Sequence, residues 1–189
     1  MLNNIRETIV PIIDRIGSIF AKTGISPTGW SIMGLLFAAL SGIAFSSLWS
    51  NWIWGGSFLL LSGFFDIVDG SVARVTKTIS NRGAFLDSNF DRIAEILVYG
   101  GLISGAIGEP LVVFAALAAS IMVSYTRSKG ESLNVNVSGI GIGERAERIF
   151  ILAVASILGF PYYGVILIVV LASLTFIQRF IYIIKKLEK

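Results

Sequence analysis

Long apolar segments, separated by short polar turns, follow one another from residue 30 to residue 184. About 20 apolar residues are enough to cross the hydrocarbon core of a bilayer as a helix, and a helix satisfies its own backbone hydrogen bonds there. Charged residues make up only 14% of the 189 residues, against about 25% in soluble domains. The sequence therefore predicts an all-α integral membrane protein with six transmembrane helices. We expect them at residues 30–49, 52–73, 84–106, 110–128, 145–159 and 162–184.

The segment before the first span has a different pattern. In residues 3–22 apolar side chains such as Ile12, Ile16 and Ile19 recur at helical spacing, and charged residues fall largely between them. This pattern predicts an amphipathic helix that lies in the membrane interface; the alternative is a surface helix of a soluble domain. We expect one domain, 1–189, with the bundle in 27–186. No cleavable signal peptide is evident, so the spans themselves are expected to direct insertion.

The basic residues predict the orientation. The turns at 50–51, 105–110 and 159–163 contain no Lys or Arg, so all fifteen basic residues fall at the other ends of the spans. The positive-inside rule places those ends in the cytoplasm. The sequence thus predicts a multi-pass protein of the cell membrane with both termini inside. Anionic membrane lipids and this topology account for the net charge of +3, and no nucleic-acid partner is expected.

Two missing residue types narrow the possible chemistry. The chain has no Cys and no His, which excludes disulfides, a thiolate nucleophile, an imidazole base and a His-ligated zinc or haem. A bound metal must therefore be a hard cation with oxygen ligands, and carboxylates are the expected bases.

Four carboxylates occur together, and we call them the aspartate cluster: Asp66, Asp69, Asp87 and Asp91. Their spacing of three and four residues puts each pair on one helix face. The connection between the two spans is short, so we expect the helices to be antiparallel neighbours and the pairs to converge. Carboxylates this close favour binding of Mg²⁺ or Mn²⁺. The alternatives are structural ion pairs with nearby arginines and lysines, or the site of a cation-coupled carrier.

Small residues flank the cluster at helical offsets. Gly70, Ala73 and Gly83 leave room for a ligand to approach the backbone, and Arg74 could meet a phosphate with its guanidinium fork. Close helix packing is the alternative explanation for these small residues.

These residues form one continuous pattern: Asp66-x2-Asp69-Gly70-x2-Ala73-Arg74-x8-Gly83-x3-Asp87-x3-Asp91. The pattern resembles the signature of the CDP-alcohol phosphotransferases. The resemblance implies transfer of the phosphoryl-lipid part of a CDP-lipid to a second alcohol, with release of CMP. It also implies two divalent cations, Mg²⁺ or Mn²⁺, and a homodimer.

The resemblance also implies roles for single residues. Asp66, Asp69 and Asp87 would ligand the metals, and Asp91 would share a metal or act as the general base. Gly70, Ala73, Arg74 and Gly83 would hold the CDP part, with Arg74 acting at its phosphates. Ser31 would join them from a stretch in which Thr28 replaces the Asn often present in the family.

The acceptor must be inferred from residues outside the signature. Arg127, Lys129, Arg145 and Arg148 form a basic group that could hold a phosphorylated acceptor; a positive-inside loop with local Glu–Arg pairs is the alternative. The strings around these residues resemble the branch of the family that uses inositol 1-phosphate. Glycerol 3-phosphate as acceptor, or CDP-inositol as donor, remains open.

Two glycine motifs remain. Gly101-x3-Gly105 is expected to serve helix packing or dimerisation. The stretch Gly139-Ile-Gly141-Ile-Gly143 has no strand around it, so we expect a loop and not a dinucleotide-binding fingerprint.

Overall fold

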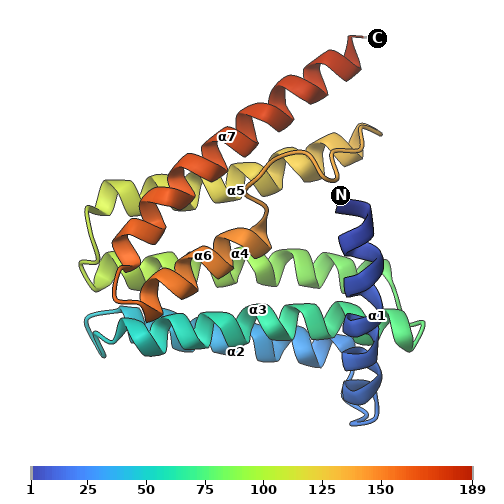
Figure 1. Cartoon of the computed structure of the whole chain (residues 1–189), viewed down its shortest axis with the longest axis horizontal. Helices are drawn as coiled ribbons and strands as arrows, with labels where there is room; N and C mark the ends of the chain where they lie inside the picture. The colour runs from blue at the N-terminus through green and yellow to red at the C-terminus, as the bar shows by residue number, and fades with distance from the viewer. Residues whose placement is uncertain (1, 189) are drawn as a thin grey trace.

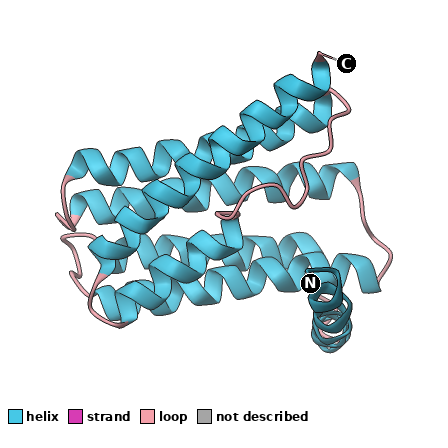
Figure 2. Cartoon of the chain, turned by 45° about the horizontal axis from the view of Figure 1, so that its top comes forward, coloured by secondary structure: helices cyan, strands magenta, loops and turns pink. Residues whose placement is uncertain are grey.

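The computed structural model describes residues 2–188, with side chains from residue 10 onward. The described chain consists of helices and loops (Figure 2). The helices are α1 (Leu2–Ala21), α2 (Pro27–Phe45), α3 (Trp52–Val75), α4 (Asn81–Ser104), α5 (Pro110–Ser132), α6 (Arg145–Ile157) and α7 (Pro161–Leu187). The all-helical architecture agrees with the sequence prediction.

The helices from α2 to α7 form a bundle, and α1 lies across one end of it (Figure 1). Within the bundle α2 packs against α3 and α4, while α7 packs against α5 and α6. α6 also packs against α3 and so joins the two groups. α1 rests on α3, where Gly17 leaves room for Ser71. The first half of the apolar face predicted for α1 belongs to residues whose side chains lie outside the described part.

Three of the helices in residues 2–188 are long and apolar enough to cross a membrane: α2, α5 and α7. α3 and α4 have 24 residues each, but they carry the aspartate cluster. α6 has 13 residues and is therefore about 20 Å long, shorter than the roughly 30 Å hydrocarbon core. The chain is an all-helical membrane protein, while six spans and an interfacial α1 stay predictions.

Glycines bring α4 close to α2. A Cβ on Gly101 would overlap the backbone of Gly42 in α2, and a Cβ on Gly105 would overlap the carbonyl of Phe45. The Gly101-x3-Gly105 motif therefore packs α4 against α2 within one chain. It is not free to form a dimer contact, and the homodimer stays a prediction.

We expect Gly101→Ala to lower the free energy of unfolding by about 1–3 kcal/mol, because the added methyl group forces α4 away from α2. Unfolding by SDS in mixed micelles measures this change. Gly100→Ala is the matched control, because a Cβ there meets no atom within 4 Å. The control should be neutral or stabilising by roughly 0.5–1 kcal/mol, and equal losses in both variants would contradict the packing role.

Candidate active site

The aspartate cluster lies where α3 ends and α4 begins. Carboxylate oxygens of Asp66, Asp69 and Asp87 all lie within 4.8 Å of one another. Asp69 is only 6% exposed, and its Oδ2 has no hydrogen-bond partner in the described part of the chain. Three converging carboxylates with a buried oxygen left without a partner fit a hard divalent cation.

The helices that carry the cluster differ in one respect from the expectation. α3 and α4 run in opposite directions (Figure 1), but they are not among the closely packed helix pairs; α2 packs against both instead. The predicted opposite directions and the convergence of the carboxylates are confirmed. Close packing of α3 on α4 is absent from the described chain, because a short connection fixes direction and not packing. The separation leaves room between them for the carboxylates and a ligand.

A cavity of about 400 Å³ opens on one side of the cluster. We call it the glycine cavity. Every residue predicted to hold the CDP part lines it, together with two aspartates: Ser31, Gly70, Ala73, Arg74, Gly83, Asp69 and Asp87. A Cβ on Gly70 would meet only the end of the Arg74 side chain, at 3.6 Å. Gly70 therefore keeps the cavity open and does not serve helix packing.

Two helices begin at the glycine cavity. Pro27 and Thr28 of the first turn of α2 line it, as do Gly83 and Ala84 of the first turn of α4. Helix N-termini carry partial positive charge and free N–H groups, which suit phosphate oxygens. The cavity thus combines carboxylates suited to a cation with helix ends suited to an anion.

A second cavity, of about 260 Å³, lies on the other side of the cluster. We call it the arginine pocket, after the five arginines that line it: Arg92, Arg127, Arg145, Arg148 and Arg179. Asp66 and Asp91 line the same pocket. Lys129 does not line it and lies exposed on α5. The structure therefore brings together three of the four predicted basic residues and adds Arg92 and Arg179.

Arg179 was missed by sequence reasoning. It is 2% exposed, donates from Nη2 to Glu144 Oε1 (2.8 Å), and donates from Nε to the Ile140 carbonyl (2.8 Å). The available signal was a charged residue inside an apolar segment, because such residues are usually functional.

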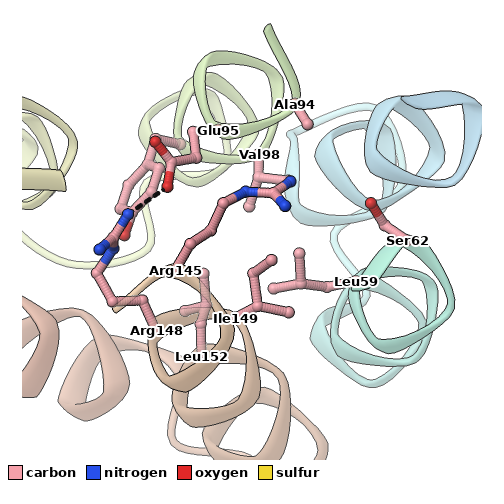
Figure 3. A pocket seen from close by; sticks show the side chains of 10 residues that line it. Leu59, Ser62, Ala94, Glu95, Val98, Arg145, Arg148, Ile149 and Leu152 are labelled. Atoms are coloured by element: carbon pink, nitrogen blue, oxygen red, sulfur yellow. Dashed lines mark hydrogen bonds and ion pairs between the residues drawn. The ribbon is translucent and has the colours of Figure 1, made fainter. Parts of the chain in front are cut away.

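Arg148 was predicted to hold the acceptor phosphate, but its side chain is buried and already paired. Its side chain is 2% exposed, and its Nη2 donates to Glu95 Oε1 at 2.7 Å, as Figure 3 shows. Its Nη1 donates to the carbonyl of Gly143 at 2.8 Å. Glu95 lies one turn beyond Asp91 on α4, so the pair fixes the first turn of α6 against α4. Sequence reasoning gave Glu95 no role.

Arg145 joins the pocket to the cluster. Its Nη1 lies 2.8 Å from Asp66 Oδ2 and 2.9 Å from Asp91 Oδ1. Asp91 also lies 3.3 Å from Arg92 Nη1. The carboxylate of Asp91 therefore faces two arginines, and Asp66 faces Arg145 as well as Asp69 and Asp87.

The glycine-rich loop before α6 sets the position of Arg145. Its backbone N–H groups at Ile142 and Gly143 donate to Thr175 Oγ1 at 3.2 and 2.9 Å. Gly141 has a φ of +107°, which only glycine adopts readily, and it lies directly against Thr175. This stretch is the expected loop, and it is held tightly against α7.

Two further basic residues of the predicted site, Arg74 and Arg127, are half-exposed. Arg74 Nε lies 3.2 Å from Asp14 Oδ1 of α1, and Arg127 Nε lies 2.9 Å from Glu131 Oε1 one turn on. Exposed pairs of this kind contribute about 0–1 kcal/mol, so both guanidinium groups can exchange partners for a ligand at little cost.

With this geometry in place, comparison with known proteins identifies the family. Residues 25–178 match CDP-alcohol phosphatidyltransferase. The chain belongs to this family and is a transferase of phosphate-containing groups. This membership removes the cation-coupled carrier as an alternative.

Two archaeal relatives cover nearly the whole chain. Archaetidylinositol phosphate synthase of Pyrococcus horikoshii is 37% identical over 188 residues, covering 100% of this chain and 99% of the relative. The protein of the same name from Methanothermobacter thermautotrophicus is 38% identical over 196 residues, covering 100% and 96%.

A solved structure shares the fold. Phosphatidylinositol phosphate synthase of Mycobacterium tuberculosis, solved with CDP-DAG bound, superposes with a TM-score of 0.77 at 22% identity and covers 92% of this chain and 94% of its own. The same protein has been solved in complex with manganese and citrate, also with a TM-score of 0.77.

We expect Arg148→Met to destabilise the protein by about 3–5 kcal/mol, because it leaves Glu95 buried without its partner. The double variant Glu95→Leu/Arg148→Met should recover most of that loss. Unfolding by SDS measures both. Arg127→Met removes an exposed pair and should cost less than about 1 kcal/mol. A double variant whose loss equals the sum of the single losses would contradict the pairing.

Proposed function

We propose that this enzyme transfers a phosphatidyl-type group, with diacyl or archaeol chains, from a CDP-lipid to inositol 1-phosphate and releases CMP. The observation that carries the proposal is the place of the aspartate cluster between two cavities. Asp69 and Asp87 line the glycine cavity, and Asp66 and Asp91 line the arginine pocket. A donor on one side and an acceptor on the other would meet at the cluster.

The glycine cavity suits the CDP part of the donor. Gly70, Ala73 and Gly83 leave space for the nucleotide, while Arg74 and the starts of α2 and α4 face its phosphates. Ser31 and Thr28 line the same cavity. CDP-DAG bound to the mycobacterial structure supports a CDP-lipid as donor.

The aspartates fit divalent cations by their ligand chemistry. Asp66, Asp69 and Asp87 would hold them, with Asp91 beside them, and we propose two ions, Mg²⁺ or Mn²⁺. The manganese complex of the mycobacterial structure supports this metal class. Such cations, when bound, would supply positive charge against the phosphate oxygens of the reacting group.

Asp91 is the general base of the proposed reaction. Its carboxylate takes the proton from the acceptor hydroxyl, and the acceptor oxygen forms a bond to the β-phosphorus of the donor. The bond between that phosphorus and the CMP oxygen breaks, and its electron pair leaves with CMP. The position of Asp91 at the wall of the arginine pocket supports this role.

The arginine pocket suits the phosphate of the acceptor. Arg127 and Arg145 could present guanidinium forks to it, and the buried Arg148 and Arg179 also line the pocket. Lys129 lies outside the pocket, so it would attract an acceptor only before the acceptor enters the pocket. The archaetidylinositol phosphate synthases among the relatives support inositol 1-phosphate. Glycerol 3-phosphate is the alternative acceptor, and CDP-inositol the alternative donor.

The bundle places the site at the end that carries the basic residues. We propose that this end faces the cytoplasm, that the single domain crosses the cell membrane six times, and that α1 lies in the interface. α1 lies across this end and contacts α3 through Asp14 and Arg74, which supports its interfacial place. A homodimer is proposed from the family resemblance.

We expect the purified protein with Mg²⁺ and a CDP-lipid to release CMP when inositol 1-phosphate is added. Asp91→Asn should lower the rate at least about 100-fold, as expected for loss of a general base. Chromatographic measurement of CMP checks both. Glu147→Gln is the control, because Glu147 is exposed on α6 and lines neither cavity.

Parallel reactions separate the alternatives. CMP release with glycerol 3-phosphate but not with inositol 1-phosphate would overturn the proposed acceptor. Turnover of CDP-inositol but not of the CDP-lipid would overturn the donor.

The proposed orientation can be tested with single cysteines, because the chain has none. We expect Leu48→Cys to react with a membrane-impermeant maleimide on intact cells and Ser138→Cys to react only after lysis. Leu48 lies in the α2–α3 turn, 85% exposed, and Ser138 lies exposed in the loop before α6. The reverse labelling pattern would invert the proposed topology.

A further inference from the structure

Arg145 occupies a position that no other basic residue shares. It lines the arginine pocket and also the narrow space among the aspartates, where Ser31 and Asp87 are its neighbours. Its Nη1 contacts carboxylate oxygens from two helices, Asp66 on α3 and Asp91 on α4. Arg92 also lines the arginine pocket and lies 3.3 Å from Asp91, but it does not line the narrow space among the aspartates. Arg127 and Arg179 make no ion pair with these aspartates in the described structure.

The backbone of Arg145 is fixed, whereas its guanidinium has few partners. Arg148, one turn on, is held by Glu95 and by the Gly143 carbonyl. Beside Arg145 lies a small internal cavity of about 20 Å³, into which its side chain extends in Figure 3. Its Nε has no hydrogen-bond partner in the described part of the chain. The guanidinium is therefore tied to its place only by the two carboxylates.

A guanidinium and a divalent cation compete for the negative charge of the same carboxylates. With Nη1 at 2.8 Å from Asp66, a second positive charge beside that carboxylate would be repelled by the guanidinium in a site with little water. The arginine pocket, which Arg145 already lines, offers the side chain a second position.

We propose that Arg145 is a movable counter-charge that couples the cation site to the acceptor site. Without a cation it neutralises Asp66 and Asp91; cation binding displaces it into the arginine pocket, where it binds the acceptor phosphate. The coupling makes acceptor binding depend on cation loading, and by linkage the acceptor raises cation affinity equally. This inference rests on the proposed function for the identity of the acceptor.

Mn²⁺ binding to the purified protein tests the coupling without turnover. The signal of free Mn²⁺ in electron paramagnetic resonance gives its affinity. Arg145→Gln should bind Mn²⁺ about tenfold more tightly than the unchanged protein, because it removes the competing charge. In the unchanged protein inositol 1-phosphate should tighten Mn²⁺ binding, and in Arg145→Gln this effect should be largely lost.

Arg127→Gln is the matched control. It removes an equal charge from the same pocket, but its partner in the structure is Glu131 and not an aspartate of the cluster. Its Mn²⁺ affinity should stay within about twofold of the unchanged protein, since exposed charges interact weakly.

Unchanged or weaker Mn²⁺ binding by Arg145→Gln would overturn the inference, and so would an equal gain in Arg127→Gln. If Arg145→Gln does not elute as a folded protein in gel filtration, Arg145→Met decides. This variant also removes the competing charge and keeps an unbranched side chain, so it should bind Mn²⁺ more tightly, and no gain would overturn the inference. If the protein releases CMP but Arg145→Gln leaves the Mn²⁺ affinity unchanged, only this inference is overturned. If Arg145→Gln binds Mn²⁺ more tightly but the unchanged protein releases no CMP, only the proposed function is overturned.

Discussion

A charge inside an apolar helical bundle needs a partner, and this requirement shapes the end of the molecule that carries the site. Arg145 ties α6 to α3 and α4 through Asp66 and Asp91, and Arg148 ties it to α4 through Glu95. Arg179 ties α7 to the loop before α6 through Glu144. The same end holds the aspartate cluster, so the pairs that stabilise the helices also set the distances of the site.

The glycine cavity could be predicted from the sequence because it is built locally. Its signature residues lie on two helices joined by a short loop, and the helical repeat alone decides which of them share a face. Gly70 and Gly83 confirm the argument, since both open toward the cavity. The carboxylates of α3 and α4 converge as predicted, but the packing of α2 against both helices was not predicted, because it depends on residues outside the signature.

The arginine pocket could be predicted only in part, for a physical reason. Besides Asp66, Asp91 and Arg92 of the signature helices, its residues come from α5, α6, α7 and the end of the loop before α6. Whether Arg148 faces a ligand or Glu95 depends on how that loop docks on Thr175. A count of basic residues near the membrane surface therefore found Arg127 and Arg145, included Lys129, which lies outside the pocket, and omitted Arg92 and Arg179.

α5 and α7 line the arginine pocket but not the glycine cavity, and this difference bears on specificity for the acceptor. Substitutions on α5 or α7 would reach the proposed acceptor site and leave the proposed nucleotide site intact, because no residue of those helices lines the glycine cavity. Arg145 is the exception, since its guanidinium touches carboxylates from both signature helices. An enzyme built this way can change its acceptor by altering one half of the bundle. It must keep a residue such as Arg145, which lies between the two cavities and contacts carboxylates of both signature helices.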